Sequence, residues 1–157
     1  NEDTLSSKAA ELLIKQGLTI SAAESLTAGM LLAELAGEAG ISASLKGGVI
    51  VYNEQAKVEQ LEISPSLLKE FGVVSKECAT ALAMQVKKKF NSDIGVGLTG
   101  VAGPDPHDNK PVGTVWIGIA FQDGTVEAYN LSLSGSRNAN RRRAAHYALY
   151  YLIKHLQ

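Results

Sequence analysis

Short apolar segments that run into small, polar turns alternate with helical stretches along the first two thirds of this chain. Each apolar segment has the length and residue types of a buried strand, and each turn contains hydroxyl, carboxylate, amine or glycine residues. The strand–turn pairs are Leu18–Ala23 with Glu24–Gly29, Val49–Val51 with Tyr52–Lys57, and Ile94–Leu98 with Thr99–Pro104. This alternation favours a sheet covered by helices on both faces.

Helix signals complete the order of elements. Leu5, Ala9 and Leu12 recur at helical spacing, and Asn53 and Ser75 are typical N-caps. Val112 to Phe121 and Val126 to Leu133 predict a hairpin, and a final helix follows. The predicted order is therefore α β α β α α α β β β α, in which the last strands make the sheet mixed. We interpret Val49–Val51 as a strand buried on both faces, because its residues do not alternate.

Length and composition agree with one domain over residues 1–157. The chain has 157 residues, a formal net charge of -1 and one cysteine, Cys78, so neither a disulfide framework nor a nucleic-acid partner is expected. No apolar run reaches the roughly 18 residues of a membrane span, so no membrane association and a cytoplasmic location are expected. Because the chain begins at Asn1, we expect a processed protein or a piece of a longer one.

Ligands of open α/β sheets gather at the carboxyl ends of the strands. The three polar turns are therefore expected at one edge, and two further loops, Gly40–Ser44 and Ser134–Asn138, could join them. The Glu24–Gly29 turn precedes a predicted helix from Met30 to about Ala36, an arrangement that exposes backbone N–H groups to an anion.

The sequence lacks the usual signatures of metal, triad and nucleotide-loop chemistry. Its histidines, His107, His146 and His155, form no H-E-x-x-H pattern, and no cysteine cluster accompanies them. A Ser–His–Asp triad would need His107, but no G-x-S-x-G segment is present. A Walker-type phosphate loop is also missing. Hydroxyl-plus-lysine chemistry remains, without a metal or cofactor.

Ser42, Tyr52 and Lys57 surround one predicted strand and are the candidates for this chemistry. A serine attacks well only when a base takes its proton, and a lysine can be that base when its pKa is lowered. Lys57 is expected four residues after the N-cap Asn53, where the helix dipole disfavours an ammonium and Glu54 partly opposes this. Each residue also has a structural interpretation, as a turn serine, a packing tyrosine and a surface lysine.

Phosphate binding is the second chemistry that the sequence offers. Gly100 and Gly103 free the backbone to point N–H groups inward, and Thr27 and Thr99 add hydroxyls. Arg137, just before the last helix, is a candidate phosphate clamp. The structural alternatives are tight-turn glycines and a surface arginine.

Taken together, these segments resemble the CinA C-terminal domain family, the PncC-type nicotinamide mononucleotide (NMN) deamidases. The matching segments are Ala23–Gly29, Gly47–Tyr52 with Ala56 and Lys57, Gly72–Ser75, Thr99–Pro104, Pro111–Val115 and Gly135–Arg137. The resemblance implies a three-layer α/β/α sandwich with a mixed, mostly parallel sheet of about five strands. It also implies metal-independent hydrolysis of NMN to nicotinate mononucleotide and ammonia, in pyridine nucleotide recycling.

By position, the resemblance implies Ser42 as nucleophile, with Lys57 and Tyr52 assisting, and Ser25, Thr99 and Arg137 as substrate contacts. Backbone N–H groups near Gly47 and Gly48 are the expected oxyanion donors. An alternative assignment makes Ser25 the nucleophile and Ser42 structural.

The chain also departs from the family pattern in two places. Pro106-His107 stands where two glycines are frequent, and Ala28 stands where glycine is frequent. The family further suggests a homodimer or higher oligomer, and an N-terminal companion domain in longer relatives. The alternative to an enzyme is a non-catalytic module that senses nucleotides or binds a protein.

Overall fold

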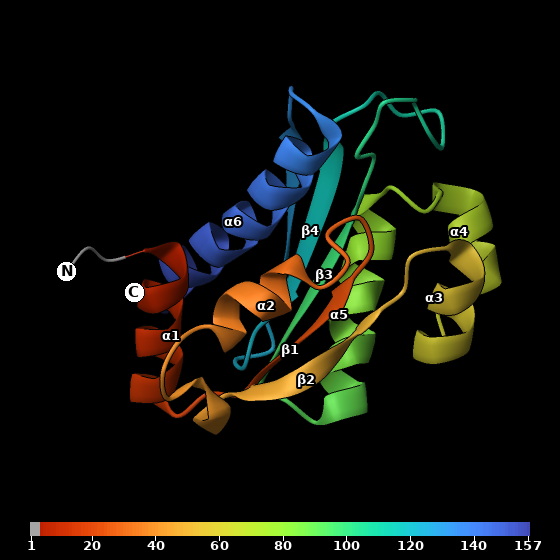
Figure 1. Cartoon of the computed structure of the whole chain (residues 1–157). Helices are drawn as coiled ribbons and strands as arrows, with labels where there is room; N and C mark the ends of the chain where they lie inside the picture. The colour runs from red at the N-terminus through yellow and green to blue at the C-terminus, as the bar shows by residue number, and fades with distance from the viewer. Residues whose placement is uncertain (1–3) are drawn as a thin grey trace.

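A computed structural model describes residues 4–157 of the chain (Figure 1). The order of elements is the predicted one, with an added 3-10 turn, η1, before the second strand. The elements are α1 (Leu5–Gln16), β1 (Ile20–Glu24), α2 (Met30–Ala36), η1 (Ile41–Ala43), β2 (Leu45–Ile50), α3 (Glu54–Leu61), α4 (Pro65–Phe71), α5 (Lys76–Phe90), β3 (Ile94–Gly100), β4 (Thr114–Ala120), β5 (Val126–Ser132) and α6 (Arg137–Leu156).

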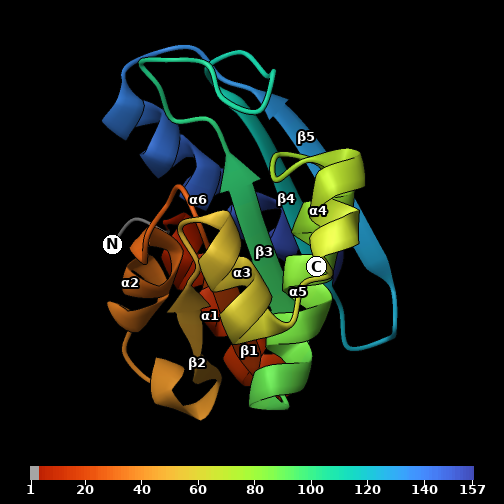
Figure 2. The same cartoon turned by 90° about the vertical axis from the view of Figure 1, so that its right-hand side faces the viewer.

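The strands form one five-stranded sheet in the order β2-β1-β3-β4-β5. Strand β1 pairs in parallel with β2 and with β3, whereas β4 is antiparallel to both β3 and β5. Only β4 therefore runs against the other strands, which confirms a mixed, mostly parallel sheet. The carboxyl ends of β1, β2, β3 and β5 consequently meet at one edge of the sheet (Figure 2).

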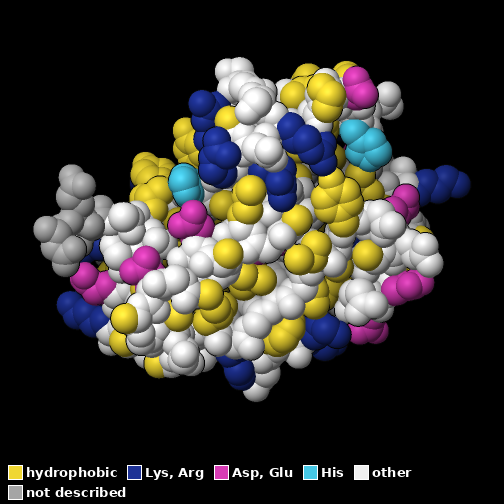
Figure 3. Space-filling model, in the orientation of Figure 1, with side chains coloured by type: hydrophobic (Ala, Val, Ile, Leu, Met, Phe, Trp, Pro, Cys, Tyr) yellow, Lys and Arg dark blue, Asp and Glu magenta, His cyan; other side chains and the backbone are white. Residues whose placement is uncertain are grey.

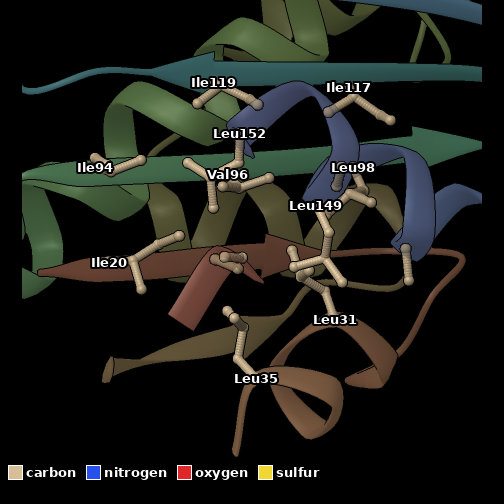
Figure 4. Close-up of a cluster of buried hydrophobic side chains, with 14 of the residues drawn as sticks. Ile20, Leu31, Leu35, Ile94, Val96, Leu98, Ile117, Ile119, Leu149 and Leu152 are labelled. Atoms are coloured by element: carbon tan, nitrogen blue, oxygen red, sulfur yellow. The ribbon is translucent and has the colours of Figure 1, made fainter. Parts of the chain in front are cut away.

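Two apolar cores lie on the two faces of the sheet. The larger core joins the sheet to α1, α2 and α6, and Figure 4 shows Leu31, Leu149 and Leu152 meeting strand residues such as Val96. The smaller core packs α3, α4 and α5 against the opposite face, and it includes Leu82 of α5. Helices on both faces confirm the three-layer α/β/α sandwich.

Glycines in the central strands set how closely α5 approaches the sheet. A Cβ at Gly97 would lie 2.5 Å from the carbonyl oxygen of Ala79, and one at Gly118 would lie 2.4 Å from the same oxygen. Any side chain there would clash with the helix backbone. The Gly95-Val96-Gly97 segment is therefore a strand surface shaped for helix packing.

The interpretation of Val49–Val51 as a fully buried strand is wrong. Strand β2 spans Leu45–Ile50 and pairs only with β1, so it is an edge strand. The side chain of Ile50 is 53% exposed, and only Val51, just beyond the strand, is fully buried. Three residues were too few to show the period-2 alternation of exposed and buried side chains.

Candidate active site

The loops at the carboxyl edge of the sheet enclose a cleft made of two adjoining cavities. One cavity, of about 370 Å³, contains Arg137, and the other, of about 450 Å³, contains Lys57. Both are lined by Ser25, Tyr52, Gly100 and His107, which therefore mark the junction of the two cavities. In Figure 3, Lys and Arg side chains gather over the N-terminal end of α6, beside this edge.

Ser25 and Lys57 meet at the floor of the cleft. Ser25 follows β1 directly, and Lys57 lies in α3, which begins after the N-cap Asn53 accepts a hydrogen bond from the Ala56 N–H at 2.8 Å. The Nζ of Lys57 lies 3.2 Å from the Oγ of Ser25 and donates to the carbonyl of Val51 at 3.0 Å. The fold therefore pairs a hydroxyl with an amine, as the alternative assignment required.

Lys57 is held in surroundings that disfavour its charge. Its side chain is 2% exposed, and burial lowers its pKa below the ordinary value of a lysine. Attraction to Cys78 and Glu54 opposes this shift only in part. Burial also raises the pKa of Cys78 to about 11, so at neutral pH this thiol carries no charge that would stabilise the ammonium. Burial thus favours the neutral amine.

The structure does not bring Ser42 to Lys57, so the predicted pair is not formed in it. Ser42 lies in η1, before β2, whereas Lys57 follows that strand. The six residues of β2 span roughly 20 Å at the usual rise of a strand. Ser42 is exposed at the amino edge of the sheet and lines neither cavity of the cleft. Gly40–Ser44 therefore does not join the polar turns.

The predicted oxyanion donors near Gly47 and Gly48 also lie away from the cleft. Both residues are inside β2, where they pair with Ser21 and Ala22 of β1. A Cβ at Gly47 would lie 2.8 Å from the ring of Phe90, and a Cβ at Gly48 would lie 2.5 Å from Leu32. These glycines make room for side chains on the two faces of the sheet.

The backbone N–H groups of the turn after β1 bind a carboxylate of the protein itself, that of Glu24. The carboxylate of Glu24 is fully buried and accepts hydrogen bonds from the N–H groups of Gly29 at 3.1 Å, Leu31 at 3.0 Å and Leu32 at 2.9 Å. These are the first N–H groups of α2, so this helix N-terminus is already satisfied. The expectation that it exposes its N–H groups to an anion is wrong, because Glu24 already accepts from them.

Arg137 and Tyr52 form the opposite wall of the cleft. The Arg137 guanidinium donates to the Tyr52 hydroxyl at 2.6 Å and to the carbonyl of Gly103. Tyr52 is 55% exposed and lines both cavities. Arg137 begins α6 after the short connection that follows β5, so the Ser134–Asn138 loop does join this edge. The link places a cation beside a phenol at the mouth of the cleft.

The predicted hydroxyl and glycine contacts divide into two groups. Gly100 and Thr99 line the cleft, although the Thr99 hydroxyl is occupied by donation to the Val73 carbonyl at 2.6 Å. Thr27 is completely buried and lines neither cavity, and its hydroxyl has no hydrogen-bond partner among residues 4–157. Thr27 therefore lies outside the cleft at which we predicted its contact with substrate, because its side chain is buried in the protein.

Sequence reasoning missed the place of His107 in this cleft and the capping role of Glu24. The sequence offers His107 only as the base of a triad, whereas the structure puts it at the junction of the two cavities. The Pro106-His107 departure from the family pattern was the available signal. For Glu24, the signal was an acidic residue five positions before a glycine that starts a helix.

The fold and the cleft define a class: a three-layer α/β/α protein with a buried serine–lysine pair at the carboxyl edge of its sheet. The family model of the CinA C-terminal domain matches residues 2–156, and the chain belongs to this family. A relative from Lysinibacillus sphaericus, named as a competence-damage inducible protein, is 52% identical over 157 residues, and one from Bacillus cytotoxicus is 46% identical. All of this chain is matched, but it spans 38% of each relative's length.

Solved structures from the same superfamily share the fold. The competence or damage-inducible protein from Enterobacter asburiae is 28% identical, with a TM-score of 0.94 over 99% of this chain and 100% of that one. A CinA superfamily protein from Klebsiella pneumoniae is 29% identical, with a TM-score of 0.93 over 97% of this chain and 95% of that one. Across residues 4–157, no helix is both long and apolar enough to cross a membrane.

Proposed function

We propose that this domain is an amidohydrolase that converts NMN to nicotinate mononucleotide and ammonia, with Ser25 as the nucleophile and Lys57 as its base. The observation that carries the proposal is the 3.2 Å contact between Ser25 Oγ and the buried Nζ of Lys57. A lysine buried beside a hydroxyl, with its pKa lowered, has the properties of a general base. The family membership supports the choice of substrate class.

The first half of the reaction forms an acyl-enzyme. The Ser25 hydroxyl, which lies 3.3 Å from the Tyr52 carbonyl, rotates its proton toward the neutral Lys57 amine. Lys57 takes that proton as Oγ attacks the carboxamide carbon, which gives a tetrahedral oxyanion and an ammonium on Lys57. The C–N bond then breaks, Lys57 returns the proton to the leaving nitrogen, and ammonia departs.

The second half returns the enzyme to its starting state. Lys57 takes a proton from water, and the resulting hydroxide attacks the ester carbon. The ester bond breaks, Ser25 Oγ recovers the proton from Lys57, and nicotinate mononucleotide is released. No other proton source is required, because one amine serves both halves.

The cavity that contains Arg137 suits the phosphate of the nucleotide. Arg137 is exposed at its wall and carries a permanent charge, with N–H groups beyond those that bond Tyr52 and Gly103. Cations are favourable partners for a phosphate, and charge-assisted hydrogen bonds are roughly twice as strong as neutral ones. We place the carboxamide at Ser25 and the phosphate at Arg137, with Tyr52 holding the guanidinium in position.

The test is ammonia release from NMN, NAD and nicotinamide, measured side by side with the unsubstituted protein and with Lys57→Ala. We expect release from NMN above all, and loss of at least about 10²-fold in kcat for the variant. Binding of NMN without ammonia release would make the domain a non-catalytic nucleotide-binding module. Preferential release from NAD or nicotinamide would overturn the choice of substrate.

A further inference from the structure

The chain turns sharply above the cleft, in a short hairpin that contains His107. The N–H of Lys110 donates to the carbonyl of His107 at 2.9 Å, and the N–H of His107 donates back at 3.3 Å. Between them, Asp108 and Asn109 have φ angles of 55° and 57°. Two residues with positive φ closing a two-residue loop are typical of a type I′ hairpin turn. His107 thus occupies a defined position within its loop.

A second contact ties this hairpin to the far wall of the cleft. The Asp108 carboxylate accepts a hydrogen bond from the N–H of Val74 at 3.0 Å. Asp108 approaches so closely that a Cβ at Gly72 would lie 2.4 Å from its Oδ2. The neighbouring Val73 carbonyl is in turn bound by Thr99 at the end of β3. The hairpin is therefore anchored to the sheet through the segment between α4 and α5.

His107 stands where the two cavities join. Lys57 and Thr99 line only the cavity of the serine–lysine pair, whereas Arg137 and Gly103 line only the other. Ser25 and Arg137 line the same cavity, so a ligand that reaches from one to the other lies in a cavity that the exposed His107 also lines. In a nucleotide, the part between the base and the phosphate is the sugar. An imidazole can donate from one nitrogen and accept at the other, which suits sugar hydroxyls.

We propose that His107 is a specificity-determining residue that contacts the sugar and selects nucleosides and nucleotides over the free base. This inference rests on the proposed function, because that function sets the base at Ser25 and the phosphate at Arg137. The anchored hairpin keeps the imidazole at the junction before substrate arrives, so binding does not have to order the loop. His107 is not assigned a proton transfer, since the serine–lysine pair has its own base.

The experiment is isothermal titration of NMN, nicotinamide riboside and nicotinamide into Ser25→Ala, which binds without turnover. In that background, His107→Ala is expected to raise the Kd of NMN and of the riboside by about five- to tenfold, which is the effect of losing one or two hydrogen bonds. The Kd of nicotinamide should stay unchanged. His107→Gln, which keeps a donor and an acceptor, should recover part of the loss. His146→Ala is the matched control, because that histidine lies on α6 beside Glu34, outside the cleft.

The outcomes separate this inference from the proposed function. Undiminished binding of NMN by His107→Ala overturns the inference alone, and so does an equal loss for NMN and nicotinamide. If neither the unsubstituted protein nor Ser25→Ala binds NMN, the proposed function is overturned, and the inference with it.

Discussion

The two ends of the sheet carry serines that look equivalent in the sequence but have opposite surroundings. Ser25, at the carboxyl edge, is buried, contacts Lys57 and lines the cleft. Ser42, at the amino edge, is exposed in a 3-10 turn and lines neither cavity. Ser42 is closer to Lys57 along the chain, yet the length of β2 separates them. The direction of a strand therefore decides which hydroxyl reaches the amine.

Replacing each of the two serines by alanine is the strongest test of this comparison. Ser25→Ala should lower kcat for ammonia release from NMN by at least about 10³-fold, because the attacking atom is removed. Ser42→Ala should leave kcat within about twofold. The assay is steady-state ammonia release, with circular dichroism to establish that both variants fold. A large loss with Ser42→Ala and a small one with Ser25→Ala would reverse the assignment.

The second largest effect is expected in how kcat/KM depends on pH, because Lys57 must lose its proton to act as the base of Ser25. Its pKa is lowered in the folded protein, so kcat/KM should rise with pH, as the amine loses its proton, and level off below the ordinary lysine value of 10.5. Lys57→Arg should lower activity by about 10²- to 10⁴-fold at every pH, because a guanidinium stays charged. An activity that keeps rising up to pH 10.5 would contradict a lowered pKa.

The same shift predicts how stability changes with pH. Between the lowered pKa of the folded state and 10.5, the unfolded chain binds more protons at Lys57 than the folded one. The free energy of unfolding must then increase as pH rises through that window. Relative to Lys57→Met, which has no such proton, the unsubstituted protein should gain stability with pH. Urea unfolding of both proteins at several pH values measures this difference.

Removing the carboxylates of Glu24 and Glu38 in turn compares how much each one stabilises the fold at its own edge of the sheet. Glu24→Ala removes a buried carboxylate that binds three N–H groups of the turn, and it should destabilise the fold by roughly 2–4 kcal/mol. Glu38 is half-buried and accepts one hydrogen bond, from Ser6 at 2.9 Å, so Glu38→Ala should cost about 1 kcal/mol or less. Chemical unfolding measures both. Equal losses would mean that the carboxyl-edge turn has no special dependence on Glu24.

The smallest expected effects come from single positive φ angles at the two edges. Ala28, in the Ser25 turn, has a φ of 45°, so Ala28→Gly should stabilise the protein by about 0.5–1 kcal/mol. Gly40, before η1, has a φ of 84°, so Gly40→Ala should destabilise it by about 1 kcal/mol. Thermal unfolding resolves the opposite signs. A loss of stability in Ala28→Gly would show that the alanine methyl packs favourably enough to outweigh its strain.

The sequence by itself determined the order of helices and strands, the sandwich and the edge at which polar turns gather. These follow from local signals, namely hydrophobic periodicity, caps such as Asn53 and turn residues such as Gly103. It also identified Lys57 as a candidate base, because its place in α3 depends on a nearby cap. Local interactions set such features, and they are readable without knowing the strand order.

Only the tertiary structure decided which groups meet. Ser25 and Lys57 are 32 residues apart and are joined because β1 and β2 are parallel neighbours. Burial of Lys57, which lowers its pKa, likewise depends on packing between α3 and α5 that no local pattern encodes. Whether a turn offers its N–H groups to a ligand depended on Glu24, which had already taken them. Pairings across a sheet are non-local, so a single sequence leaves them open.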